Sequence, residues 1–157
     1  MSTRTATRPS GTAGGGLRRS AKRVLRGVGV ATSWARPLPD FVVIGAKRAG
    51  TTSLYAYLAE HPDVAPLFPA RQRIKGVHYF DTNHHRGLRW YRSHMPSWIR
   101  RTGGRLAGEA SPYYLAHPLA AERAARTIPD AKLVVLLRNP ADRAYSHYRE
   151  RVRHDAE

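Results

Sequence analysis

Short apolar runs alternate with helix-like segments along most of the chain. Two runs are short, apolar and rich in β-branched residues, which is typical of buried strands: "DFVVIG" (40–45) and "AKLVVLL" (131–137). The second of them carries the clearest signal for a buried strand. A third segment, "GRLAGEASPYYL" (104–115), begins as a strand and breaks at Ser111–Pro112, and "VHYFD" (77–81) is a further strand candidate.

Helical patterns separate these runs. The first helix is expected in "GTTSLYAYLAEH" (50–61), and two more are expected in "RGLRWYRSHM" (86–95), with Leu88 and Trp90 facing inward, and in "HPLAAERAARTI" (117–128). A last helix is expected to follow Asn139 as its N-cap, with Pro140 at the first helical position. Strands that alternate with helices predict an α/β fold with a central parallel sheet in three α/β/α layers.

The first 39 residues differ in composition from the rest. They contain the linker-like run "SGTAGGG" and many arginines, so we expect residues 1–39 to be a disordered basic tail and residues 40–157 to form the domain. An alternative is a short amphipathic helix in "LRRSAKRVLRGVGVA" (17–31) that contacts a membrane or a polyanion. A sheet of only three or four strands leaves an open edge, so we also expect the domain to be incomplete at its C-terminal end.

Charge and composition limit the classes of function and of site that the chain can have. The chain has 27 lysine and arginine residues against 11 acidic ones, which favours anionic partners. The absence of cysteine excludes disulfides, thiolate metal sites and a cysteine nucleophile. No apolar run approaches the roughly 18 residues of a membrane span, and no secretory signal is apparent, so we expect a cytoplasmic protein. No recognition helix or aromatic-basic ribbon indicates specific nucleic-acid binding.

The stretch "FVVIGAKRAGTTSLYAYL" (41–58) has the order of a phosphate-binding loop: strand, glycine turn and helix. Gly45 and Gly50 have the P-loop spacing, and backbone N–H groups from Ala49 to Ser53 can face an anion at the helix N-terminus. Thr51 stands where the P-loop lysine is required, which counts against hydrolysis of ATP or GTP. A tight surface turn is the alternative.

Two cations, Lys47 and Arg48, lie on this loop instead of the missing lysine. Asp81 is the nearest candidate for a metal ligand, and no convincing metal site is apparent. His84–His85 is interpreted as a solvated loop because no third ligand has suitable spacing.

A second element, "LVVLLRNPADRAYSHY" (133–148), places Arg138 at the end of a strand. Ligands of open α/β sheets bind beyond the carboxyl ends of the strands, so Arg138 is expected at the same edge as the loop. Ser146 lies two turns into the next helix and offers a hydroxyl to the same anion. The alternative is that Arg138 caps the sheet and that Ser146 is an ordinary helix-surface residue.

Together the two elements resemble the sulfotransferase superfamily, in particular the branch of heparan sulfate sulfotransferases and their bacterial relatives. The resemblance runs from about Phe41 to Arg153 and includes "HPDV", "VHYFD", "GLRWYRSHMP" and "GEASPYYL" in order. It implies a P-loop-like fold and 3′-phosphoadenosine 5′-phosphosulfate (PAPS) as the donor, without a metal. It also implies a longer C-terminal portion with further donor contacts.

The resemblance implies roles for individual residues. The loop is expected to grip the 5′-phosphosulfate, and the second element the 3′-phosphate. The implied donor-binding residues are Lys47, Arg48, Ala49, Gly50, Thr51, Thr52, Ser53, Arg138 and Ser146. Arg48 occupies the position of the family's catalytic lysine, and we expect it to share charge stabilisation with Lys47.

The catalytic base is less directly implied. The family carries a glutamate two residues before the histidine of this segment, and the matching position here is Gly76. His78 is then the candidate base, since the ordinary pKa of histidine suits that role. A structural role for His78 is the alternative, and Glu109 is another candidate base or orienting group.

The acceptor is expected to be a hydroxyl or amine of a carbohydrate or small metabolite. Arg71, Arg73 and Lys75 are candidates for lining its cleft, with solvated surface cations as the alternative. Two other functions compete with sulfuryl transfer: a P-loop nucleotide or nucleoside kinase, disfavoured by Thr51, and a non-catalytic polyanion binder driven by the tail.

Overall fold

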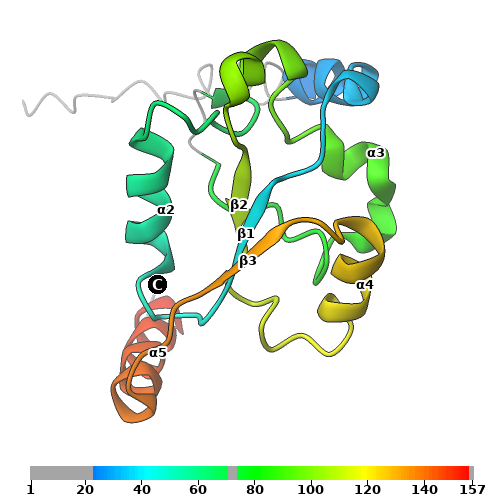
Figure 1. Cartoon of the computed structure of the whole chain (residues 1–157). Coiled ribbons are helices and arrows are strands. Elements are labelled where there is room, and N and C mark those ends of the chain that lie inside the picture. Colours follow the sequence, from blue (N-terminus) through cyan, green and yellow to red (C-terminus); the bar gives the residue numbers. More distant parts are fainter. Residues whose placement is uncertain (1–22, 71–73, 156–157) are drawn as a thin grey trace, which may run out of the picture.

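The computed structural model describes residues 23–70 and 74–155 (Figure 1). Most of the predicted tail lies before residue 23, outside the described residues. The described part is ordered: residues 23–31 are helical and are followed by the 3₁₀ helix η1 (Ser33–Ala35). Arg26 and Arg36 hold this segment against the rest of the domain, because both guanidinium groups donate hydrogen bonds to it. Arg26 donates to Ser93 Oγ at 3.2 Å, and Arg36 donates to the Met95 carbonyl at 2.6 Å. The prediction of a disordered tail is therefore wrong for residues 23–39.

Within residues 23–70 and 74–155, three parallel strands form the sheet, in the order β2-β1-β3. These strands are β1 (Phe41–Gly45), β2 (Gly108–Ala110) and β3 (Lys132–Val135). In the register, Val42 pairs with Glu109 on one side and with Leu133 on the other. The parallel arrangement brings the carboxyl ends of all three strands to one edge of the sheet, as the alternation of strands and helices predicts.

Helices lie on both sides of this sheet, so the predicted three-layer arrangement is confirmed. Figure 1 shows α2 (Thr51–Glu60) on one side and α4 (Ala120–Thr127) on the other. Tyr55 fixes α2 to the sheet, because its hydroxyl donates to the Gly108 carbonyl at 3.1 Å. The remaining helical elements are η3 (His84–Arg86), α3 (Gly87–Arg92), η4 (Trp98–Gly104) and α5 (Pro140–Asp155).

The cap of α5 agrees with the sequence prediction, whereas the buried face of α3 differs from it. Asn139 caps α5 as predicted, since its Oδ1 accepts the N–H of Ala141 at 3.0 Å. Leu88 is exposed, which differs from the prediction, and Tyr91 is the fully buried residue of α3. Tyr91 stacks on Tyr79 with 4.4 Å between the ring centroids, which ties α3 to the segment around residue 79.

The predicted strand "VHYFD" is a loop in the structure. Its backbone N–H groups are bonded by side chains, and these bonds replace a strand ladder. Val77 donates to Glu109 Oε2 at 2.6 Å, His78 to Ser111 Oγ at 2.9 Å and Tyr79 to the Tyr114 hydroxyl at 2.6 Å. All three acceptors belong to the segment that contains and follows β2. An apolar pattern cannot distinguish a strand from a loop that is bonded in this way.

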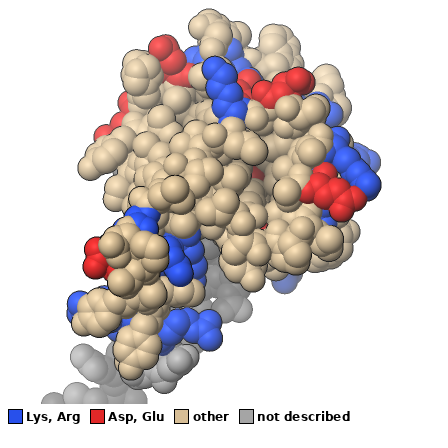
Figure 2. Space-filling model, turned by 60° about the horizontal axis from the view of Figure 1, so that its bottom comes forward, with Lys and Arg blue, Asp and Glu red and all other residues tan. Residues whose placement is uncertain are grey.

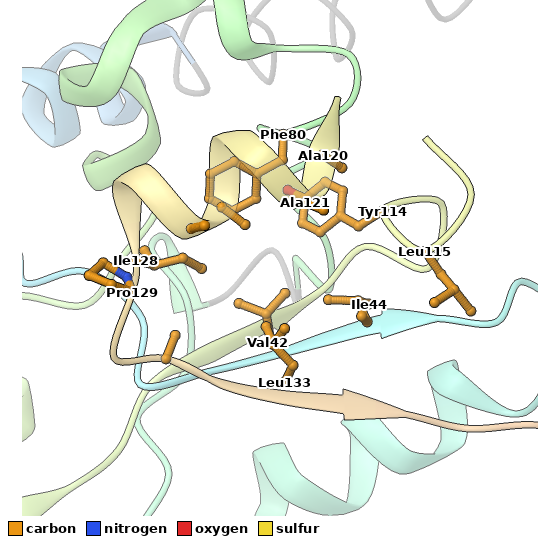
Figure 3. Close-up of a pocket in the computed structure, with 13 residues that line it drawn as sticks. Val42, Ile44, Phe80, Tyr114, Leu115, Ala120, Ala121, Ile128, Pro129 and Leu133 are labelled. Carbon is orange, nitrogen blue, oxygen red and sulfur yellow. The ribbon is translucent and has the colours of Figure 1, made fainter. Parts of the chain in front are cut away.

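Strand β3 is more exposed than its apolar sequence predicts. In the described part of the chain it pairs only with β1, and Leu133 is 57% exposed. An apolar groove of about 290 Å³ lies between the sheet and α4. Figure 3 shows Val42, Ile44 and Leu133 on the sheet side of this groove, opposite Phe80 and Tyr114.

The stability of the fold depends on pH through His94. It is buried beside α3, with Nδ1 2.9 Å from the Trp90 carbonyl oxygen. Burial, and then the charge of Arg26, lower the pKa of His94 to about 4. An unfolded chain binds this proton below about pH 6.5, whereas the folded chain keeps His94 neutral. The contribution of His94 to stability is therefore complete above about pH 6.5 and is lost as the pH falls towards 4.

We predict that the free energy of unfolding attributable to His94 falls by about 2 to 3 kcal/mol between pH 6.5 and 4. Urea unfolding across this range measures it. The variant His94→Gln should show a flatter pH dependence than the unmodified chain, whereas His85→Gln, at an exposed histidine, should not. Equal slopes of the free energy of unfolding against pH in all three proteins would contradict this prediction.

Candidate active site

The loop between β1 and α2 opens at the carboxyl edge of the sheet. The left-handed backbone of Gly50 (φ 93°) turns the chain into α2, which begins at Thr51. The loop is fixed to the end of β3, since Ala46 N–H donates to the Leu136 carbonyl at 2.8 Å. The first N–H groups of a helix have no acceptor within the helix itself, so this end of α2 is suited to an anion.

One predicted donor is already engaged within the loop. The N–H of Ala49 donates to the Ala46 carbonyl at 3.0 Å. Because this N–H is already bonded, the predicted backbone N–H donors that remain for an anion are those of residues 50–53.

A cleft of about 340 Å³ lies in front of the loop, and we call it the anion cleft. It brings together cations and hydroxyls from the loop, the following helix, residue 75 and α5. Its lining residues are Lys47, Arg48, Gly50, Thr51, Thr52, Lys75, Pro112, Arg138, Ser146 and Glu150. Of the predicted donor-binding residues, Ala49 and Ser53 do not line it. Figure 2 shows Lys and Arg side chains gathered on the lower lobe, to which α5 contributes.

Direct contacts join the two predicted elements. Arg48 Nε donates to Ser146 Oγ at 3.1 Å, and Arg138 donates to the Arg48 carbonyl at 3.4 Å. The structure thus places Arg138 and Ser146 beside the loop. Glu150, which the sequence analysis did not single out, also reaches the loop. Its carboxylate lies 3.3 Å from Lys47 Nζ and 3.0 Å from an Arg48 guanidinium nitrogen.

Lys75 supplies a further cation to the anion cleft. Its Nζ donates to Thr52 Oγ1 at 2.7 Å and lies 3.4 Å from Thr51 Oγ1, at the N-terminus of α2. Burial lowers the pKa of Lys75, and the charge of Glu150 opposes this only in part. The sequence predicts Lys75 as a residue of the acceptor cleft or a solvated cation, whereas it lines both clefts; Arg71 and Arg73 lie outside the described residues.

A second cleft of about 490 Å³ adjoins the first, and we call it the His78 cleft. Lys47, Lys75 and Pro112 line both clefts. The other lining residues are Gly76, His78, Asp81, Thr82, Ala110 and Tyr113. A group bound in the anion cleft is therefore next to a group bound in the His78 cleft.

His78 forms a pair with Asp81. Its Nδ1 lies 2.8 Å from Asp81 Oδ2, and the Asp81 side chain is 1% exposed. The other Asp81 oxygen accepts the N–H of Thr82 at 2.6 Å, so the carboxylate is held in place. An acceptor at Nδ1 favours the tautomer with a proton there, which leaves Nε2 as the free base nitrogen.

Asp81, considered above as a metal ligand, is thus the partner of His78. Within residues 23–70 and 74–155, no group of three or more histidine, aspartate or glutamate side chains is placed to hold a metal ion.

Glu109 is completely buried below the His78 cleft, on β2. Its carboxylate accepts the Val77 N–H at 2.6 Å and the hydroxyls of Ser111, Tyr91 and Tyr114 at 2.7 to 3.0 Å. Burial raises the pKa of Glu109, and these hydrogen bonds oppose the increase. Because the group is sealed from both clefts, the structure favours Glu109 as an orienting group over Glu109 as a base.

Gly76 is closely packed against the chain that follows β2. A Cβ atom at this position would lie 2.5 Å from the Ala110 carbonyl oxygen and 2.9 Å from Ser111 Oγ. A glutamate at this position, as the resemblance implies for the family, therefore would not fit this backbone without movement.

Comparison with known proteins identifies the family of this site. The model of the sulfotransferase domain family matches residues 38–157. The chain belongs to this family. The membrane-associated sulfotransferase kil1 of Dictyostelium discoideum is 38% identical over 111 residues, which are 71% of this chain and 22% of that protein. The human bifunctional heparan sulfate N-deacetylase/N-sulfotransferase 1 is 36% identical over 118 residues, which are 74% of this chain and 13% of that protein.

A crystal structure gives the same result for the fold. The sulfotransferase from Alicyclobacillus acidocaldarius is 31% identical, with a TM-score of 0.59, and the match covers 77% of this chain and 53% of that one. Family membership argues against a nucleotide kinase. It also agrees with the P-loop-like fold that the resemblance implies.

The relatives are much longer than this chain, and one of them bears on its location in the cell. The chain spans less than a quarter of the length of the two curated relatives named above. The expectation of a cytoplasmic protein is corrected, because one of them is named as membrane-associated. No helix among the described residues has the length and apolar character needed to cross a membrane.

Proposed function

We propose that this sulfotransferase chain moves a sulfuryl group from PAPS to a hydroxyl or amine. The single observation that carries the proposal is the anion cleft, where Lys47, Arg48, Lys75 and Arg138 meet at the N-terminus of α2. Such a combination of cations and helix N–H groups suits a ligand with several phosphate-like groups. The residues present therefore fit a donor that carries both a phosphosulfate and a second phosphate.

Each half of the cleft is proposed to hold one end of the donor. The loop cations, the hydroxyls of Thr51 and Thr52, and the N–H groups of residues 50–53 bind the phosphosulfate. Arg138 and Ser146 bind the 3′-phosphate, and guanidinium groups are well suited to bidentate phosphate contact. PAPS supplies the activated sulfuryl group when bound. No step in this scheme requires a metal ion.

The reaction forms one sulfur–oxygen or sulfur–nitrogen bond to the acceptor and breaks the sulfur–oxygen bond to the leaving phosphate. Lys47 and Arg48, with Lys75, stabilise the negative charge that develops on this phosphate. His78 takes the acceptor proton at Nε2, and Asp81 holds Nδ1–H and stabilises the imidazolium that forms. The open His78 cleft is the proposed acceptor site, next to the anion cleft.

The acceptor is proposed to be a carbohydrate or a small metabolite. The relative whose name contains heparan sulfate N-sulfotransferase supports the carbohydrate. The lysines that line the His78 cleft, Lys47 and Lys75, also suit an acceptor with negative charge.

Donor binding is tested with adenosine 3′,5′-bisphosphate, the product of PAPS. We predict metal-independent binding that weakens by about tenfold to a hundredfold in Arg138→Ala, since a charge-assisted phosphate contact contributes about 1.5 to 3 kcal/mol. Calorimetric titration measures it. The control is Arg126→Ala, which removes the same charge from α4, where Arg126 pairs with Glu122. Equal affinity in all three proteins would count against the assigned donor site.

The assigned base is tested by the rate of sulfuryl transfer. With PAPS and a chitosan oligosaccharide, which offers hydroxyls and amines, His78→Gln should lower kcat by about a hundredfold to a thousandfold. The affinity for adenosine 3′,5′-bisphosphate should be unchanged, because His78 does not line the anion cleft. His85→Gln is the control. A His78→Gln variant with unaltered kcat would show that another group takes the proton.

A further inference from the structure

The two cations of the loop already have an anionic partner in the protein. Glu150, on α5, pairs with both Lys47 and Arg48, at 3.3 Å and 3.0 Å. Ser146, one turn earlier on α5, accepts the Nε–H of Arg48. The carboxylate and hydroxyl of α5 therefore occupy donor groups of the same guanidinium that is proposed to bind phosphosulfate.

The position of Glu150 makes this pairing relevant to the cleft. Its side chain lines the anion cleft together with the loop cations. Side-chain exposure is 25% for Glu150, 43% for Lys47 and 38% for Arg48, so the three groups are partly accessible. Burial raises the pKa of Glu150, but the ion pair with Lys47 and the charge of Arg48 outweigh this and lower the pKa overall. The side chain is therefore ionised at neutral pH.

We propose that Glu150 is an internal anion that competes with the donor for Lys47 and Arg48. The inference rests on the proposed function. A phosphosulfate that binds both cations cannot share them with the carboxylate without close contact between negative charges. Donor binding therefore requires the Glu150 carboxylate to leave the loop, and this step lowers the affinity for the donor and for the bisphosphate product.

The opposite role would have the opposite effect. If Glu150 only held Lys47 and Arg48 in the orientation that binds the donor, its removal would weaken binding. The sign of the change in affinity therefore distinguishes competition from positioning.

The variant Glu150→Gln tests the proposal in the full chain. Glutamine keeps the size and helix propensity of the side chain and removes its charge. We predict that adenosine 3′,5′-bisphosphate binds about threefold to tenfold more tightly to Glu150→Gln, as expected when two partly exposed ion pairs no longer compete. Calorimetric titration at low salt measures the change, since salt screens such pairs. Circular dichroism establishes that the variants are folded.

A matched control is available on α4. Glu122 pairs with Arg126 at 2.6 Å and does not line the anion cleft. Glu122→Gln makes the same chemical change and the same change in net charge, so it should leave the affinity unaltered. An equal gain in both variants would overturn the inference, because it would reflect net charge alone.

The remaining outcomes separate the two proposals. If the unmodified chain binds adenosine 3′,5′-bisphosphate and Glu150→Gln binds it equally or more weakly, the inference is wrong and the proposed function stands. If neither protein binds it, both are wrong. Titration with adenosine, which has no phosphate, should give no difference between the two proteins, and a gain there would also overturn the inference.

Discussion

The buried carboxylate of Glu109 is the constraint on which the rest of the site depends. It accepts hydrogen bonds from the backbone of Val77 and from three hydroxyls, and it connects β2 to the loop that carries His78. Removal of this carboxylate would leave its buried donors without an acceptor, at a cost of about 1 to 3 kcal/mol for each polar group. Glu109 therefore fixes the path of the chain at Val77, between Gly76 and His78, which line the His78 cleft.

The position of the clefts follows from this path and from the parallel sheet. Residues that lie far apart in the sequence meet because the carboxyl ends of the strands share one edge. Lys75 bonds Thr52 at the N-terminus of α2, and Arg138 and Ser146 bond Arg48 on the loop. In the proposed reaction, charge stabilisation and proton removal then take place in adjoining clefts. In this proposal His78 takes the proton, and the close packing of Gly76 leaves no room for a larger side chain at that position.

Much of this arrangement was predictable from the sequence, because local signals and tertiary structure agree there. Glycine spacing and helix periodicity predict the loop and α2, and the Asn139–Pro140 signal predicts the start of α5. The meeting of Arg138 with the loop follows from a general rule of open sheets.

The rest depends on contacts that a linear pattern does not contain. Residues 77–79 resemble a strand, but their N–H groups bond to side chains more than thirty positions away. β3 is apolar, yet pairing on one side only leaves Leu133 exposed in the described part of the chain. In the sequence, Glu150 is an ordinary residue of a charged helix. Only the fold shows that its carboxylate contacts the loop.

The loop, Arg138 and Ser146 are proposed to form one donor site that needs no metal ion. A ¹H–¹⁵N NMR titration of the chain with adenosine 3′,5′-bisphosphate, with and without Mg²⁺, tests this proposal. We expect shifts of the amide signals of residues 50–53 together with those around Arg138 and Ser146, equal in the presence and absence of the metal. Shifts confined to the basic helical segment 23–31, or shifts that require Mg²⁺, would contradict it.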